Sequence, residues 1–90
     1  MTHITPSDLS ILLVEPSDTQ RKIIINKLAK EGITQVRTAK NIAESIDIIE
    51  RHPPDLIASA MYFEDGTAID LIKKIKHNEK LAEIAFMLFT

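Results

Sequence analysis

Four short runs with the character of β-strands recur along the chain, and a segment with helical periodicity follows each of the first three. The runs are Leu9–Val14, Thr34–Ala39, Asp55–Ala60 and Ile84–Thr90. A continuous apolar run such as the first is typical of a strand buried on both faces, as in a parallel sheet. The alternation predicts a β-α-β-α-β-α-β chain in which helices cover both faces of a parallel sheet.

The first helical segment has recognisable ends. Pro16 and Ser17 open it, and Gln20 follows Ser17 by three residues, which is the spacing of a capping box. Gly32 is expected to end it. The residues predicted to line its inward face are Ile24, Ile25, Leu28 and Ala29.

Two further helices are predicted from the same kinds of signal, namely their ends and their apolar faces. The first of them stops before the double proline Pro53-Pro54, because a residue that precedes proline avoids the helical conformation. The last runs from Thr67 to His77. The predicted inward residues are Ile42, Ile46 and Ile49 in one helix, and Ala68, Leu71, Ile72 and Ile75 in the other.

The bulk composition limits the classes of function. The chain has 90 residues, a net charge of −2 and no cysteine. The even mixture of charges provides no basic stripe for nucleic acid and no polybasic segment for a membrane surface. No apolar run is long enough to span a bilayer, and no signal peptide is recognisable. A single cytoplasmic domain over residues 9–90, preceded by a tail at residues 1–8, is the expected organisation.

Parallel α/β sheets bind their ligands at the carboxyl ends of the strands. The candidate site residues are therefore Glu15 and Pro16 after the first strand, residues 60–65 after the third, and Thr90 at the end of the fourth. Asp65-Gly66 on its own has the composition of an ordinary turn. His3, His52 and His77 are predicted to be surface residues, because their spacing fits no metal site.

Three segments resemble the receiver domain of response regulators, and together they cover nearly the whole chain from Leu9. ILLVEPSDTQRKIIINKLAKEGI is similar to the receiver's first strand and helix, with an acid at the strand end and Arg21 six residues later. HPPDLIASAMYFEDGTAIDLIKKIK is similar to its third strand, active-site loop and third helix. IAFMLFT resembles the fourth strand, which ends on a hydroxyl residue. The resemblance implies a flavodoxin-like, doubly wound parallel sheet, here ending after the fourth strand.

The resemblance also implies a particular chemistry. A receiver uses an aspartate at the end of its third strand as the nucleophile toward a phosphohistidine donor. Two acids after the first strand help to hold magnesium, and a threonine or serine after the fourth strand and a lysine after the fifth contact the phosphoryl oxygens. Attack by a carboxylate on phosphorus gathers negative charge, which the cation and the donors offset.

This sequence departs from that pattern at several positions. Ala60 occupies the nucleophile position, and the acidic pair is reduced to Glu15 followed by Pro16. Glu64 replaces the loop proline, and Thr90 alone matches the expected residue. A single glutamate is a poor magnesium site, so no cofactor is expected and Glu15 is only a weak candidate ligand. The other interpretation of Glu15 is a solvated acid near the start of a helix, where the helix dipole favours it.

Other residues of the third strand and its loop have both a chemical and a structural interpretation. Ser59 is expected to face away from the site, because successive strand residues point to opposite faces. Tyr62 and Phe63 either fill the volume that Ala60 leaves or form an exposed contact patch, and we favour the first. Asp65 is the alternative phosphoacceptor, with Mg²⁺.

The sequence therefore predicts a degenerate receiver domain that is a protein-interaction module and not an enzyme. The expected partners are a histidine kinase, another receiver or an attached output domain. A nucleotide-binding domain is the weaker alternative, because EPSDTQ after the first strand contains no glycine. The fourth strand, Ile84–Thr90, would form an apolar sheet edge through which a second chain could pair, and part of the first helix would lack cover.

Overall fold

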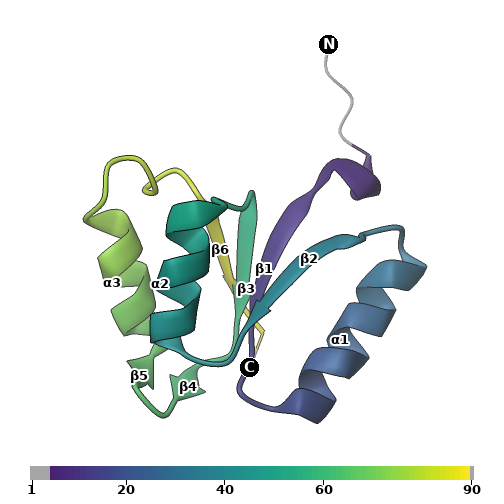
Figure 1. The fold of residues 1–90 in the computed structure, drawn as a ribbon, viewed down its shortest axis with the longest axis horizontal. Coiled ribbons are helices and arrows are strands. Elements are labelled where there is room, and N and C mark those ends of the chain that lie inside the picture. Colours follow the sequence, from purple (N-terminus) through teal and green to yellow (C-terminus); the bar gives the residue numbers. More distant parts are fainter. Residues whose placement is uncertain (1–4, 90) are drawn as a thin grey trace.

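The computed structural model describes residues 5–89, and four parallel strands form its main sheet (Figure 1). The strand order is β2-β1-β3-β6, so that β1 and β3 are central and β2 and β6 lie at the two edges. The predicted parallel α/β fold is therefore confirmed. The strands are β1 (Ser10–Val14), β2 (Gln35–Ala39), β3 (Leu56–Ser59) and β6 (Ala85–Leu88).

Three helices cover the sheet from its two faces. They are α1 (Asp18–Lys30), α2 (Ile42–Arg51) and α3 (Ala68–Lys76). Figure 1 shows α2 and α3 side by side, with α1 on the opposite side of the strands. Among residues 5–89, none of these helices combines the length and the apolar character needed to cross a membrane.

Alternating side chains of β1 divide the core into two clusters. Leu12 and Val14 pack with α2 and α3 in the larger cluster, whereas Ile11 and Leu13 face α1 in the smaller one. Ile57 of β3 belongs to the larger cluster and is fully buried. This alternation explains why the whole run of β1 is apolar: each of its faces is covered by a helical layer.

The face under α1 is less completely covered than the face under α2 and α3. No residue of α1 is fully buried, and Ile24, Ile25 and Leu28 are only half-buried. The prediction that Ala29 faces inward is wrong, because Ala29 is exposed. In contrast, the predicted inward residues of α3 are buried, apart from the half-buried Ile72.

The helix ends agree with the sequence signals. The side chain of Ser17 accepts a hydrogen bond from the amide of Gln20 (3.2 Å) and caps α1. Gly32 has a φ of +83°, the left-handed conformation that often ends a helix. Thr67 and Asp70 form a reciprocal capping box at the start of α3.

Two small elements were not predicted from the sequence. A 3₁₀ helix at Pro6–Asp8 lies within the segment interpreted as a tail, and the side-chain amide of Gln35 donates a hydrogen bond to the carbonyl of Ser7 (2.6 Å). A hairpin of β4 (Tyr62–Phe63) and β5 (Gly66–Thr67) replaces the open loop expected after β3. This hairpin lies at the carboxyl end of the sheet, beside the start of α2 and α3 (Figure 1).

Candidate functional site

The position expected to hold a nucleophile lies directly after β3, within the packed sheet. Ala60 is 6% exposed, and its amide donates a hydrogen bond to the carbonyl of Val14 in β1 (2.9 Å). The backbone is thus fixed at the place where β1 and β3 end together. The methyl side chain has no oxygen with which to accept a phosphoryl group.

The neighbouring hydroxyl group does not replace the missing carboxylate. Ser59 is completely buried, and its Oγ donates a hydrogen bond to the carbonyl of Ala60 (2.7 Å). A serine needs a general base to become a nucleophile. The hydrogen of Ser59 is instead engaged with the backbone.

Glu15 is the one acid of the predicted pair, and the structure corrects one interpretation of it. It lies at the start of α1 as expected, but it is 8% exposed and so is not a solvated acid. Its Oε2 accepts a hydrogen bond from the amide of Ser17 (2.9 Å), and its carbonyl accepts one from the guanidinium of Arg21 (2.8 Å). The carboxylate therefore helps to shape the turn from β1 into α1. Pro16, which follows it, is exposed.

Asp65 lies in the turn of the β4–β5 hairpin and caps a helix that begins more than twenty residues earlier. Its Oδ1 accepts a hydrogen bond from the amide of Ile42 and its Oδ2 one from the amide of Ala43, both at 3.0 Å. These are the first two residues of α2, so both carboxylate oxygens face the positive end of its dipole. The same carboxylate is the alternative phosphoacceptor, and both of its oxygens accept hydrogen bonds from the backbone of α2.

The hydrogen bonds also set the protonation behaviour of Asp65. Burial of the carboxyl group would on its own raise the pKa of Asp65, but hydrogen bonds from the amides of Ile42 and Ala43 and from the backbone of Asp65 itself together outweigh it. They hold the pKa below the ordinary value of 3.8. A carboxylate that accepts backbone hydrogen bonds is favoured in its charged form.

The two aromatic residues of the hairpin have different environments. Tyr62 is 76% exposed, so the interpretation that it fills the volume beside Ala60 is wrong. Phe63 is half-buried and packs against the larger core cluster. The alternation follows from the strand geometry of β4, which turns one ring to the core and the other to solvent. Glu64, in the turn, is exposed.

The side chains at this end of the sheet present few oxygen atoms to a cation. Ala60 and Pro16 have no side-chain oxygen, and the carboxylates of Glu15 and Asp65 already accept backbone hydrogen bonds. Within residues 5–89, no three acidic, histidine or cysteine side chains come together as metal ligands. Thr90, the predicted phosphoryl-contact residue, lies outside the described residues, as does His3.

Loss of Asp65 is expected to destabilise the domain by about 0.5–2 kcal/mol, the usual effect of removing a side chain that bonds to the free amides at the start of a helix. Asn41, the N-cap residue of α2, remains in place in this variant. We therefore expect Asp65→Ala to lower the urea midpoint at neutral pH. Asp47→Ala is the matched control, because Asp47 is exposed and pairs only with Arg51 on the surface of α2. An equal loss in both variants would contradict a capping role.

The same cap should make stability depend on pH. Because the folded-state pKa of Asp65 is below 3.8, its contribution is complete above about pH 4. It is lost as the pH falls through the folded-state value. The stability difference between the wild type and Asp65→Ala should therefore narrow on acidification, as urea titrations at neutral and acidic pH would show.

Comparison with known proteins supports the fold interpretation. No family model matches the chain. It is 25% identical over 81 residues to the polar-differentiation response regulator DivK of Brucella ovis, which covers 90% of this chain and 65% of that protein. The chain thus spans slightly less than two thirds of the curated relatives it matches.

Solved structures show the same likeness. The signal receiver domain of a signal transduction histidine kinase from Syntrophus aciditrophicus has a TM-score of 0.85 and 28% identity, over 91% of this chain and 61% of that one. The non-phosphorylated HemR receiver domain from Leptospira biflexa has a TM-score of 0.76 and 26% identity, over 89% and 62%. The chain therefore has the flavodoxin-like fold of a response-regulator receiver domain.

Proposed function

We propose that this chain is a cytoplasmic receiver-type module of two-component signalling that binds a protein partner and does not accept a phosphoryl group at the end of β3. The observation that carries the proposal is the position of Ala60. Its backbone is held at the carboxyl end of the sheet, and its side chain is a methyl group that cannot accept a phosphoryl group. The fold and its loops remain available for binding, whereas the nucleophile is missing.

The surroundings of Ala60 support the absence of phosphoryl transfer. Transfer to a carboxylate requires a nucleophilic oxygen, and a hard cation must offset the negative charge that develops. Nearby, Oε2 of Glu15 and Oγ of Ser59 are engaged in hydrogen bonds with the backbone. A change of conformation in such a module must come from a partner that binds one state more tightly than another.

The hairpin provides a candidate contact surface at the same end of the sheet. Tyr62 of β4 is 76% exposed, and Ile69 in the first turn of α3 is 46% exposed. Tyr62 pairs with Thr67, two residues before Ile69, so both side chains belong to one compact unit. Exposed aromatic side chains are enriched at protein interfaces. The partner classes we propose are a histidine kinase, another receiver or an attached output domain.

Intact-mass spectrometry after incubation with acetyl phosphate and Mg²⁺ tests the proposal. We expect no added phosphoryl mass on the wild-type chain, whereas a receiver with its aspartate intact should be labelled under the same conditions. The alternative is that Asp65 accepts the phosphoryl group. In that case an adduct would form on the wild type and disappear in Asp65→Asn, and the proposed function would be wrong.

A further inference from the structure

A groove of about 550 Å³ lies between α2 and α3, on the face of the sheet that both helices cover. Its apolar part is formed by Ile42 and Ile46 of α2 and by Leu81, which follows α3. Ile42 and Leu81 belong to the larger core cluster and are almost completely buried, whereas Ile46 is half-buried. The groove therefore has an apolar base that is continuous with the core, and the described helices themselves form its walls.

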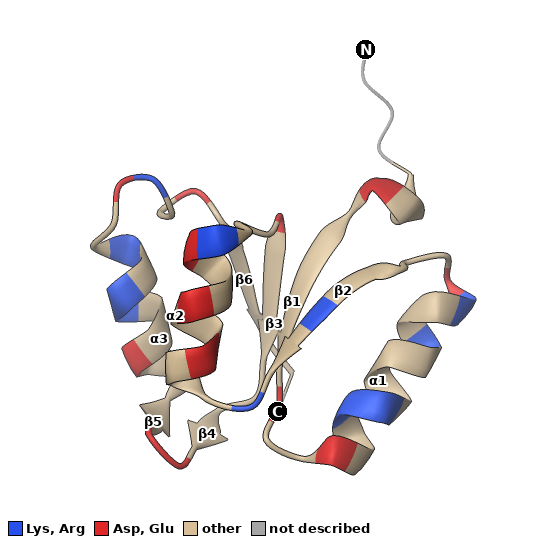
Figure 2. Ribbon diagram, viewed as in Figure 1, with Lys and Arg blue, Asp and Glu red and all other residues tan. Residues whose placement is uncertain are grey.

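The rim of this groove is acidic on the α2 side. Glu50 lines the groove in the last turn of α2, and Asp65 lines it beside the first turn. The carboxylate of Asp65 is fixed there by its hydrogen bonds to the amides of Ile42 and Ala43. Figure 2 shows acidic residues along α2 and in the turn of the hairpin. Negative charge consequently follows this side of the groove from one end to the other.

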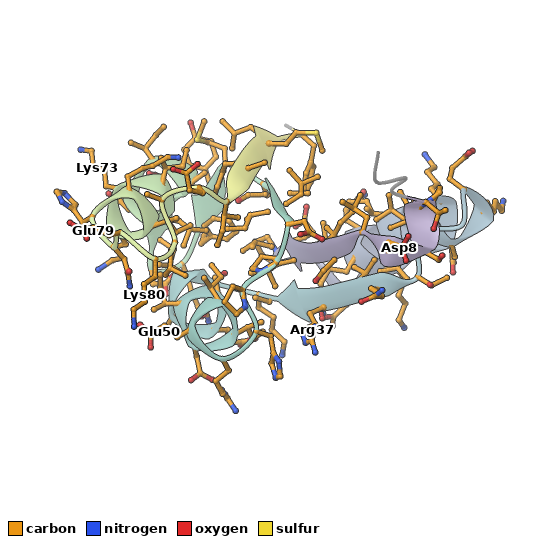
Figure 3. All side chains as sticks on the ribbon, turned by 90° about the horizontal axis from the view of Figure 1, so that it is seen from above. Asp8, Arg37, Glu50, Lys73, Glu79 and Lys80 are labelled. Atoms are coloured by element: carbon orange, nitrogen blue, oxygen red, sulfur yellow. The ribbon has the colours of Figure 1, made fainter. Side chains whose placement is uncertain are left out.

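The rim on the α3 side is basic near the end of that helix. Lys74 lines the groove in the last turn of α3, with Asn78 just beyond it. Figure 2 shows basic residues on this half of α3, and in Figure 3 Lys80, after α3, lies on the same outer side of the molecule as Glu50. Both helices begin beside the hairpin and run in the same direction (Figure 1), so their last turns lie at a similar level.

The charges on the two rims are not neutralised by ion pairs within the chain. Among residues 5–89, each ion pair lies within a single helix, α1 or α2, and neither pair involves Glu50 or Lys74. Both of these side chains are exposed. Charges of opposite sign on the two sides of an apolar surface fix the orientation of a partner that carries the complementary charges.

We propose that two copies of this chain associate through the groove between α2 and α3, about a twofold axis parallel to both helices. The inference rests on the proposed role as a protein-binding module and names a second copy as its partner. Rotation about this axis lays α2 of one copy against α3 of the other, so that each acidic rim meets a basic rim. A twofold axis perpendicular to the helices in the plane of the interface would instead lay the acidic helix α2 against its own copy. The surface is thus complementary to itself, as a closed dimer requires.

The position of each residue along its helix selects the contacts. An axis parallel to the helices leaves every residue at its own level, so Glu50 of one copy lies opposite the partner's Lys74. The twofold symmetry produces this pair twice. Ile46 lies between the two rims, where the second copy would cover it. Burial of the apolar base supplies attraction without direction, and the two charge pairs supply the orientation.

Exchange of the two charges, followed by sedimentation velocity over a range of concentrations, tests the proposal. The wild-type chain should show the mass of a dimer at high concentration. Glu50→Lys and Lys74→Glu should each raise the dissociation constant of the dimer about tenfold, because two attractive pairs become two repulsive ones. An equimolar mixture of the two variants should restore the wild-type affinity, since each opposed pair again joins an acid to a base. The double variant should dimerise for the same reason.

Glu31→Lys is the matched control, because it makes the same change of charge at an exposed residue beyond the end of α1, and it should keep the wild-type affinity. A monomeric wild type at every concentration would overturn the proposal. Association that is unchanged in both single variants would show that another surface is responsible. Weakened single variants that are not restored by mixing would rule out the opposed pairs. These readouts are independent of phosphoryl labelling, so a failure here is distinguishable from a failure of the proposed function.

Discussion

Truncating Ile57 to alanine is expected to destabilise the domain by about 2–5 kcal/mol, the usual range for a large-to-small substitution in a core. Ile57 is fully buried in β3 and packs in the cluster formed with α2 and α3. It also lies between β1 and β6, where it is aligned with Leu12 and Phe86. The resulting cavity would lie where the sheet and two helices meet, which leaves little freedom for the surroundings to collapse into it.

Urea unfolding followed by circular dichroism measures this effect. Small domains have a total stability of about 5–15 kcal/mol, so the expected loss is a large fraction of it. Ile23→Ala is the matched control, because Ile23 is 40% exposed on α1. We expect that variant to change stability by less than about 0.5 kcal/mol. A similar loss in both variants would mean that β3 is not packed as described.

The central strands were predictable because both of their faces are buried, and a strand buried on both faces is a continuous run of apolar residues. Leu12 and Leu13 are adjacent and face different helical layers, yet both are almost completely buried. A sheet covered on two sides produces such a run, and the helical segments between the runs completed the prediction of a parallel architecture. The helix ends at Ser17 and Gly32 followed from equally local signals.

The chemistry of the candidate site was only partly predictable. The position of Ala60 follows from the length of the strand that begins near Asp55, and this is a local property. The burial of Glu15 was not predicted, because it depends on how α1 and the neighbouring strands close around the carboxylate. An acid at the start of a helix is compatible with either solvent or burial.

The role of Asp65 also depends on contacts between segments that are distant in the sequence, and so it was not predicted. Its partners Ile42 and Ala43 are 23 and 22 residues away in the sequence, and no local pattern connects them. A hairpin signal was nevertheless present, because two residues separate Tyr62-Phe63 from Gly66-Thr67 and Gly66 follows an aspartate. With that signal, the exposure of Tyr62 and the burial of Phe63 could have been anticipated from strand alternation.

Gly66 links the hairpin to both helices of the larger core, and Gly66→Ala is expected to disturb all three elements. Its φ is +146°, a conformation that is close to exclusive to glycine. A Cβ atom there would lie 2.7 Å from Cδ1 of Ile42 and 2.7 Å from Oδ2 of Asp70. The backbone strain alone should cost about 1–3 kcal/mol. The two contacts would add to it by pushing aside the side-chain ends of Ile42, in the core, and of Asp70, in the capping box of α3.

Gly32→Ala provides the matched control, because Gly32 also has a positive φ but its added Cβ would meet only Pro6, at 3.5 Å or more. Gly32→Ala should lower the free energy of unfolding by about 1–2 kcal/mol, because of the left-handed backbone conformation alone. Amide hydrogen exchange separates the two cases. In Gly66→Ala the amides of Ile42 and Ala43 should lose protection, because Asp65 can no longer hold the start of α2. In Gly32→Ala they should stay protected relative to the rest of α2. Equal protection of these amides in both variants would mean that Gly66 does not position the cap.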